Sequence, residues 1–241
     1  MTENLQVEAI ADVYTDFPAK FGLPRQSGRA PALEGRIVFR EKYRNPEAVR
    51  GLERFSHIWI LFDFSQAHTD EWSPTVRPPR LGGNTRVGVF ASRSPYRPNP
   101  IGLSCVKLER IEQTQEGNVL IVSGVDLLNG TPVLDIKPYI PYADCRTEAK
   151  GDYADEHAED SVDVVISENM LQIIPPDKRE ALIQCLADDP RPQYQDDSSR
   201  VYKMRFAGWD VHFRVSGREL QVVEIVPDGE GEETGPELTN I

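Results

Sequence analysis

The residues best suited to chemistry in this sequence lie in one basic stretch, from Ser73 to Leu108. The stretch contains no Asp or Glu, although the chain holds 39 acidic residues and has a net charge of −12. Arginine presents a planar fork of donors that suits phosphates and carboxylates, so we expect an anionic ligand here. Phe90 and Tyr96 lie between the cations, which favours a functional surface over a merely solvated one. The cationic residues are Arg77, Arg80, Arg86, Arg93, Arg97 and Lys107.

Two other segments carry side chains that could bind a ligand. The Pro and Gly content of Phe21 to Pro31 predicts a loop, and this loop presents Arg25, Gln26 and Arg29 without an acidic neighbour. Asp135 and Lys137 flank one β-branched residue and therefore point to the same face of an extended strand. This pair is either a structural ion pair or a polar clamp for a ligand with hydroxyls and a charge, and both readings stay open.

Several enzyme classes lack their signatures in this sequence. It has no glycine-rich dinucleotide fingerprint, P-loop, HExxH or GxSxG motif. The histidines and cysteines have no ligand spacing, so we predict no metal site and no disulfide framework. We interpret His57 as packing at the start of a strand, and the other histidines as surface residues. The cysteines are interpreted as buried or inert thiols. These residues are His57, His68, His157, His212, Cys105, Cys145 and Cys185.

The elements that must position the basic stretch are mostly strands. Alternating or continuous apolar runs between turn residues predict seven strands within residues 1–145. They are Leu5–Val13, Gly35–Arg40, His57–Phe64, Val87–Ser92, Ile101–Ile111, Val119–Val125 and Pro132–Tyr139. The run His57–Phe64 is nearly all apolar, which predicts a strand covered on both faces. Asn45, Pro46 and Glu47 predict a helix start, and this helix should end near Gly51.

A second, smaller domain is predicted to follow a polar linker at residues 146–160. Residues 161–227 predict a strand at Val162–Ile166, two helices and three strands, which makes an α+β unit. The strands are Val201–Phe206, Trp209–Val215 and Glu219–Val226. Residues 228–241 are acidic and lack apolar anchors, so we expect a disordered tail. No apolar run approaches the ~20 residues of a membrane span, and the N-terminus lacks a signal pattern, which predicts a cytoplasmic protein without a membrane partner.

Three runs of the sequence resemble the signature blocks of the TrmO family. They are GLERFSHIWILFDF, RPPRLGGNTRVGVFASRSPYRPNPIGLS and NGTPVLDIKPYIP, and the elements DPRPQY and WDVHFRV resemble the family's second domain. The family comprises S-adenosylmethionine-dependent enzymes that methylate N6 of threonylcarbamoyladenosine at position 37 of tRNA. The resemblance therefore implies a mainly β fold, in which a single-sheeted β-barrel methyltransferase domain precedes the small α+β domain. It also implies a homodimer with tRNA as its partner.

The resemblance further implies which residues bind the cofactor S-adenosylmethionine. They are Pro24, Arg25, Gln26, Ser65, Gln66, Arg93, Cys105, Asp135, Ile136, Lys137 and Pro138. Ser65 stands where many members have His, and Cys105 stands where they have an aliphatic residue. We expect Arg77, Arg80 and Arg97 to contact tRNA phosphates.

The target amine must lose a proton during or after methyl transfer, so an acceptor near N6 is expected. Asn99, which lies between Pro98 and Pro100, is one candidate by analogy with other N6-methyltransferases, and Asp135 is the other. Asn99 is otherwise a turn residue. Two different functions also remain open at this point. One is a non-catalytic RNA-binding barrel, and the other is a methyltransferase that acts on a protein or a small molecule.

Overall fold

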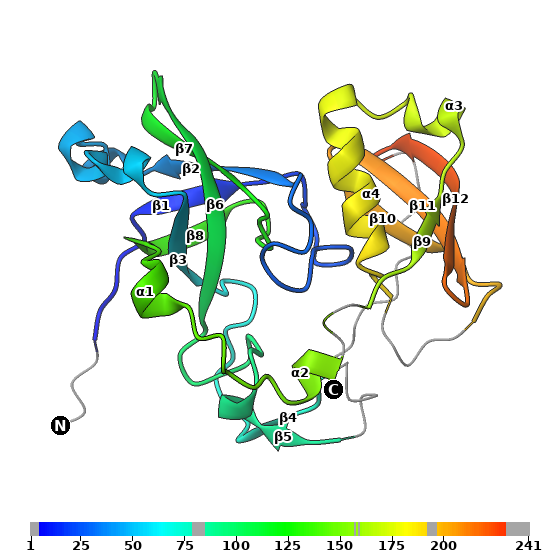
Figure 1. Cartoon of the computed structure of the whole chain (residues 1–241), viewed down its shortest axis with the longest axis horizontal. Coiled ribbons are helices and arrows are strands. Elements are labelled where there is room, and N and C mark those ends of the chain that lie inside the picture. Colours follow the sequence, from blue (N-terminus) through cyan, green and yellow to red (C-terminus); the bar gives the residue numbers. More distant parts are fainter. Residues whose placement is uncertain (1–4, 79–84, 157, 159, 192–196, 230–241) are drawn as a thin grey trace.

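The chain forms two packed units joined by a connecting segment (Figure 1). The computed structural model describes residues 5–78, 85–156, 158, 160–191 and 197–229. The first unit is a closed barrel, and the second is a four-stranded sheet with helices on one side. The predicted mainly β fold, a barrel followed by a small α+β unit, is confirmed.

The barrel closes through six antiparallel strands in the order β1-β2-β7-β6-β3-β8, and β8 pairs back onto β1. The strands are β1 (Ala11–Tyr14), β2 (Glu34–Phe39), β3 (His57–Asp63), β6 (Ile101–Thr114), β7 (Gly117–Ser123) and β8 (Thr131–Pro138). Every described strand of the barrel thus has two partners over at least part of its length, which satisfies most of its backbone donors and acceptors.

Alternation along β3 shows how the barrel core is filled. Ile58, Ile60 and Phe62 are buried inside, whereas the residues between them face outward and are half-buried. The outer face of β3 is therefore less covered than its apolar sequence predicted. Gly102 on β6 lies directly against the Phe62 ring, and a Cβ at this position would lie 2.1 Å from a ring carbon. A side chain at position 102 would displace Phe62 from the core.

The second unit consists of one sheet and a covering helix. Its sheet has the order β10-β11-β12-β9, with β9 parallel to β12. Helix α4 buries one face against this sheet, as its Leu182 and Leu186 show. Ser167 caps α3 by accepting a hydrogen bond from the Met170 amide. The elements are β9 (Asp163–Val165), α3 (Glu168–Leu171), α4 (Arg179–Ala187), β10 (Tyr202–Phe206), β11 (Trp209–Ser216) and β12 (Glu219–Pro227).

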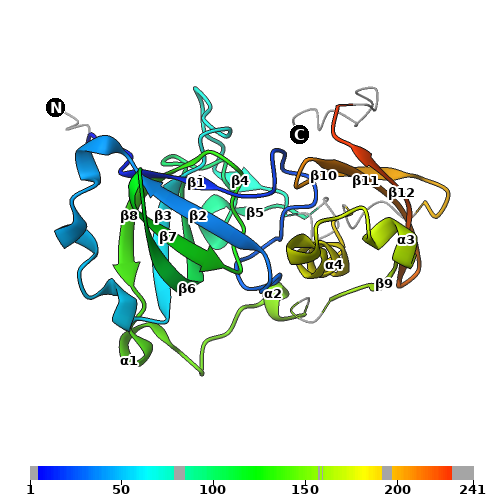
Figure 2. The same cartoon turned by 90° about the horizontal axis from the view of Figure 1, so that it is seen from above.

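The two units lie side by side (Figure 2), and buried side chains of both form one hydrophobic core. Phe17 follows β1 and packs edge-on against Phe206 of β10, with ring centroids 5.3 Å apart. Phe21 stacks beside Tyr202 at 6.2 Å. Gly22 lies against Met204, whose sulfur would be 2.1 Å from a Cβ at position 22. Between the units the chain forms two short helices, α1 (Pro141–Asp144) and α2 (Tyr153–Glu156).

Three predicted elements differ from the structure. The first strand begins at Ala11 rather than at Leu5, which is 88% exposed. The segment predicted as a helix is a 3-10 turn at Pro46–Val49, where the Asn45 side chain accepts from the Glu47 amide. The strand predicted at Val87–Ser92 ends at Gly88, and a 3-10 turn follows at Val89–Ala91. The short strands β4 (Thr75–Val76) and β5 (Val87–Gly88) pair in a ribbon outside the barrel.

The interpretation of His212 needs correction, whereas His57 begins β3 as predicted. His212 is buried, contrary to the prediction, because it lies between the carboxylates of Glu224, at 2.9 Å, and Asp210, at 3.3 Å. Cys145 is exposed, whereas Cys185 is buried as expected. Within the described residues, no group of three or more His, Cys, Asp or Glu side chains is arranged to hold a metal. In the same residues no helix is long and apolar enough to cross a membrane.

Candidate functional site

The loop Pro24–Gly28 is fixed against the end of β7 by close backbone contact. The Gly28 amide donates to the Gly124 carbonyl at 2.8 Å. Gly28 and Gly124 both have positive φ, +81° and +71°, and a Cβ on Gly124 would lie 3.2 Å from the Gly28 Cα. Two glycines therefore allow the loop to reach the barrel rim, where bulkier residues would be strained and crowded.

The same loop meets the basic stretch through Gln26 and Arg93. The Arg93 guanidinium donates to the Gln26 side-chain carbonyl, and the Gln26 amide donates to the Arg25 carbonyl at 2.7 Å. The structure thus brings together two of the predicted cofactor residues that are 67 positions apart. Both side chains keep part of their surface open to a ligand.

Asp126 lies beneath this contact and had not been singled out from the sequence. Its carboxylate accepts from the buried Ser104 hydroxyl at 2.6 Å and from the Ser27 amide. Burial raises the pKa of Asp126, while these hydrogen bonds and the charge of Arg93 act in the opposite direction. Asp126 therefore ties the loop to the barrel from the inside.

The second unit holds the loop from its other side through Asp188. This carboxylate, with only 4% of the side chain exposed, accepts from the Arg25 amide at 3.1 Å and from the Arg29 Nε at 2.6 Å. The Arg25 guanidinium donates to the Asp189 and Arg191 carbonyls. The Arg25 side chain, which is predicted to bind the cofactor, also links the two units in this structure.

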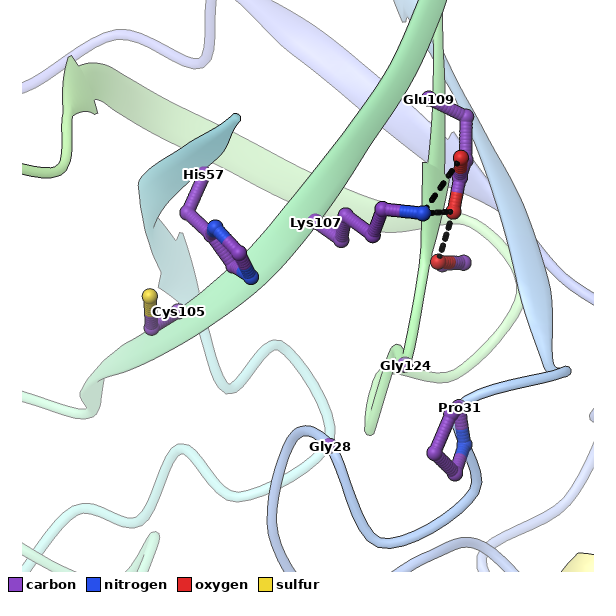
Figure 3. Close-up of a pocket in the computed structure, with 8 residues that line it drawn as sticks. Gly28, Pro31, His57, Cys105, Lys107, Glu109 and Gly124 are labelled. Atoms are coloured by element: carbon purple, nitrogen blue, oxygen red, sulfur yellow. Dashed lines mark hydrogen bonds and ion pairs between the residues drawn. The ribbon is translucent and has the colours of Figure 1, made fainter. Parts of the chain in front are cut away.

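A pocket of about 300 Å³ opens beside the loop, on the outer face of the barrel (Figure 3). Lys107 pairs with Glu109 at 2.9 Å along one wall, and Ser123 donates to Glu109 at 2.6 Å. The hydrogen bonds from Ser123 and Lys107 hold the pKa of Glu109 below its usual range. The residues that line the pocket are Gly28, Pro31, His57, Cys105, Lys107, Glu109, Ser123 and Gly124.

Cys105 forms another wall of this pocket and faces Trp59 across the strand pair. Trp59 also pairs with Lys137 on its other side. The predicted cofactor residues Cys105 and Lys137 therefore flank Trp59 in one row across β6, β3 and β8. The Trp59 indole donates to Asp144 of α1 at 3.0 Å. Burial and the Asp144 charge raise the pKa of the Cys105 thiol, which keeps it protonated and unreactive.

The predicted pairing of Asp135 with Lys137 is confirmed, with 2.7 Å between the carboxylate and the ammonium. Asp135, Ile136 and Pro138 line a second and larger pocket of about 810 Å³. Its opposite wall is formed by the 3-10 turns at residues 41–54. The predicted cofactor residues thus divide between the loop end of the barrel and the β8 segment.

Ser65, Gln66 and Asn99 are all exposed and lie near each other at the loop end of the barrel. Phe64, directly before Ser65, donates its amide to the Pro100 carbonyl at 2.8 Å. The Asn99 carbonyl accepts from the Ile101 amide at 2.7 Å, as in a turn before β6.

The predicted RNA-contacting arginines differ in their surroundings. Arg77 is exposed beside the β4–β5 ribbon. Arg97 is half-buried, and its guanidinium donates to the Ser92 carbonyl at 3.1 Å. This hydrogen bond braces the loop between Ser92 and Arg97. Arg80 lies outside the described residues.

Comparison with known proteins adds independent information to this geometry. The family model described as tRNA-methyltransferase O N-terminal domain matches residues 12–145, and that described as TrmO C-terminal domain matches residues 160–228. A tRNA (adenine(37)-N6)-methyltransferase of Escherichia coli strain K12 is 38% identical over 232 residues, covering 93% of this chain and 99% of that protein.

Two further matches extend the comparison. A tRNA (adenine(37)-N6)-methyltransferase of Eikenella corrodens is 48% identical over 180 residues, covering 73% of this chain and 99% of that protein. The crystal structure of TrmO from Pseudomonas aeruginosa has a TM-score of 0.73 and 35% identity, and the match covers 93% of this chain and 100% of that one.

Proposed function

This chain belongs to the TrmO family, and from that premise we propose that it transfers a methyl group from S-adenosylmethionine to N6 of adenosine 37 in tRNA. The observation that carries the proposal is the agreement of both family models with the two units of the fold. The resemblance seen in the sequence blocks is confirmed by the same matches.

The predicted cofactor residues, at the loop end of the barrel and on β8, have the chemistry that S-adenosylmethionine requires. The cofactor carries a carboxylate, an amine, two ribose hydroxyls and a sulfonium. Arg93 and Gln26, which are joined by a hydrogen bond, present a guanidinium and a side-chain amide. Asp135 and Lys137 of β8 present a carboxylate and an ammonium. We assign the carboxylate to Arg93 and the hydroxyls to the Asp135–Lys137 pair. The remaining predicted cofactor contacts are Pro24, Arg25, Ser65, Gln66, Cys105, Ile136 and Pro138.

S-adenosylmethionine supplies the reactive methyl group on its sulfonium, so the protein has little covalent chemistry to perform. The chain must orient the adenine amine and exclude water. Asn99 is exposed next to Ser65 and Gln66, where its side-chain carbonyl oxygen can accept a hydrogen bond from the N6 amine. Asp135 is the alternative acceptor, but its carboxylate is already paired with Lys137. We therefore favour Asn99 as the group that holds the amine.

We further propose that the substrate is tRNA that already bears threonylcarbamoyladenosine. This modification places a carboxylate next to N6, and a site with several arginines can bind that carboxylate through a bidentate contact. Arg77 and Arg97, with Arg80, are proposed to bind tRNA phosphates. The relatives' names specify adenine 37, and the preference for the modified nucleoside rests on this charge argument alone.

Methyl transfer from labelled S-adenosylmethionine tests the proposal directly. We expect one added methyl on the nucleoside of tRNA that carries threonylcarbamoyladenosine, and little on the same tRNA without it. Equal methylation of both tRNAs would contradict the carboxylate argument. No methylation of either, with RNA binding retained, would favour the non-catalytic module. Methylation of a protein or small molecule instead of tRNA would overturn the proposed substrate.

We also propose that the enzyme acts as a homodimer in the cytoplasm. The proposed division of the chain is a methyltransferase domain at 1–145, a linker at 146–160, a C-terminal domain at 161–227 and an acidic tail at 228–241. The family-model ranges, residues 12–145 and 160–228, support the three boundaries to within one residue. Asp228, the first residue of the proposed tail, is bound to Arg205 at 2.7 Å, and residues 230–241 lie outside the described part.

A further inference from the structure

An exposed pair of aromatic rings lies at the base of the β4–β5 ribbon. The Trp72 and Phe90 rings contact each other, with centroids 6.3 Å apart and planes inclined by 30°. Trp72 is 51% exposed and Phe90 is 75% exposed. The two strand ends are joined where the Val89 amide donates to the Pro74 carbonyl at 3.0 Å. The pair is therefore held in place by backbone bonds and not by burial.

These rings have no role in the core of the protein. Neither Trp72 nor Phe90 belongs to the hydrophobic cluster or to the residues packed against it. Large apolar side chains that stay exposed and adjacent are typical of surfaces that bind a partner. Their open faces indicate a partner that is itself planar or apolar.

The charge around the rings indicates what kind of partner this is. Arg77 and Arg86 are exposed on the ribbon, and Arg86 is braced by a hydrogen bond to the Thr75 hydroxyl at 3.0 Å. Asp70 and Glu71 precede Trp72, so the cationic side of the surface is the side of the ribbon and Phe90. Aromatic faces combined with arginines match unpaired RNA, whose bases stack on rings and whose phosphates pair with guanidinium groups.

The surface also lies close to the proposed reaction site. Phe90 is three residues before Arg93, so their Cα atoms are separated by at most about 11 Å. Arg93 in turn contacts Gln26 of the cofactor loop. A nucleotide stacked on Phe90 would therefore be a near neighbour of the nucleotide presented for methylation.

We propose that Trp72 and Phe90 form a stacking surface for unpaired bases of the tRNA anticodon loop, with Arg77 and Arg86 on the adjoining phosphates. The proposal rests on tRNA being the substrate, as argued above, and adds the side chains that select single-stranded RNA over duplex. Position 37 belongs to a loop whose bases are free to unstack, whereas a helical stem offers no open base faces.

The test compares binding of an anticodon stem-loop RNA with binding of a duplex RNA of equal length. Trp72→Ala and Phe90→Ala should each weaken stem-loop binding by about 5- to 150-fold, and should leave duplex binding nearly unchanged. Trp72→Phe and Phe90→Tyr keep a ring and should restore most of the affinity. Tyr142→Ala is the matched control, because Tyr142 is 88% exposed on α1, away from the ribbon in both views.

The salt dependence distinguishes stacking from charge. Loss of a ring should leave the slope of log K against log salt unchanged, whereas Arg86→Ala should reduce it by about one. Unchanged stem-loop affinity in both alanine variants would overturn the proposal. Loss of a dimer in sedimentation would show that the rings bind a second copy instead. Ring-dependent RNA binding without any methyl transfer by the wild type would refute only the proposed function.

Discussion

Replacing Asp188 with Ala should both destabilise the protein and loosen the loop at Pro24–Gly28. The Asp188 carboxylate is nearly buried and accepts from the Arg25 amide and from the Arg29 Nε. Breaking a buried pair costs roughly 3–5 kcal/mol, and a hydrogen bond to a charged group contributes roughly 1.5–3 kcal/mol. Because the Arg29 side chain is 26% exposed, water compensates part of the loss, and we expect about 2–4 kcal/mol.

Chemical denaturation gives the free energy of unfolding, and a thermal scan should show the melting temperature falling by roughly 5–15 °C. Asp188→Asn keeps the shape and one acceptor, so its loss should be smaller. Asp12→Ala is the matched control, since Asp12 makes an equally short ion pair with Arg40 on the more exposed barrel surface. That variant should lose at most about 1 kcal/mol.

Calorimetry of S-adenosylmethionine binding extends the test from stability to function. If the loop Pro24–Gly28, once released in Asp188→Ala, adopts its binding conformation about one tenth of the time, the apparent Kd of this variant for the cofactor rises about tenfold. Full stability in this variant would refute the account of the contact between the two units. Lower stability with unchanged cofactor affinity would show that the loop does not bind the cofactor.

Three other predictions follow from single contacts. Burial raises the pKa of Asp126 above its ordinary value of 3.8, so at pH values just above 3.8 the folded protein binds more protons than the unfolded chain. The free energy of unfolding of the wild type, relative to that of Asp126→Asn, should therefore fall as the pH rises through this range. Urea denaturation at several pH values measures the difference. Arg93→Ala should weaken S-adenosylmethionine binding with little change in the melting temperature, because the Arg93 side chain is exposed and its hydrogen bond is to the partly exposed Gln26 side chain. An equal affinity in calorimetry would remove Arg93 from the site. Truncation after Gly229 should leave the melting temperature unchanged. Truncation after Pro227 should lower the melting temperature by about 1–4 °C, because it removes the ion pair between Arg205 and Asp228. Equal melting temperatures of the two truncated proteins would mean that this ion pair contributes nothing to stability.

The strands could be predicted because each carries its signal locally. Alternation in β6, and in the first residues of β2 and β8, reports which side of the strand faces the core, whereas β7 is a continuous apolar run that is buried on both faces. The ends of the strands could not be predicted in the same way, since a strand stops where its partners stop. Ala11 pairs with Phe39 of β2 and Val133 of β8, and within the described residues 5–9 no residue pairs with a strand.

The candidate site was only partly accessible from the sequence. Gln26 and Arg93 came from the family resemblance, and no local pattern marks their contact. Asp188 lies 163 positions from Arg25, so its effect on the loop depends wholly on how the second unit packs. The alternation at Val87–Ser92 also misled the strand prediction, because Phe90 points outward to solvent and not into a sheet.

The closure of the barrel limits how two copies of this chain can associate. Strand addition needs a free edge. Among the described residues, β8 has no second partner beyond Val133, where the 3-10 turns at residues 41–54 lie opposite it, and β6 overhangs beyond Leu108. The β6 edge carries Arg110, bonded to Glu112 at 2.7 Å, and such charges oppose a continuous intermolecular sheet. The remaining described edges of the large sheets are β9 and β10 in the second unit. In the part of the chain that the structure describes, these edges favour a proposed dimer that forms through side-chain surfaces or through the C-terminal sheet over one that extends the barrel.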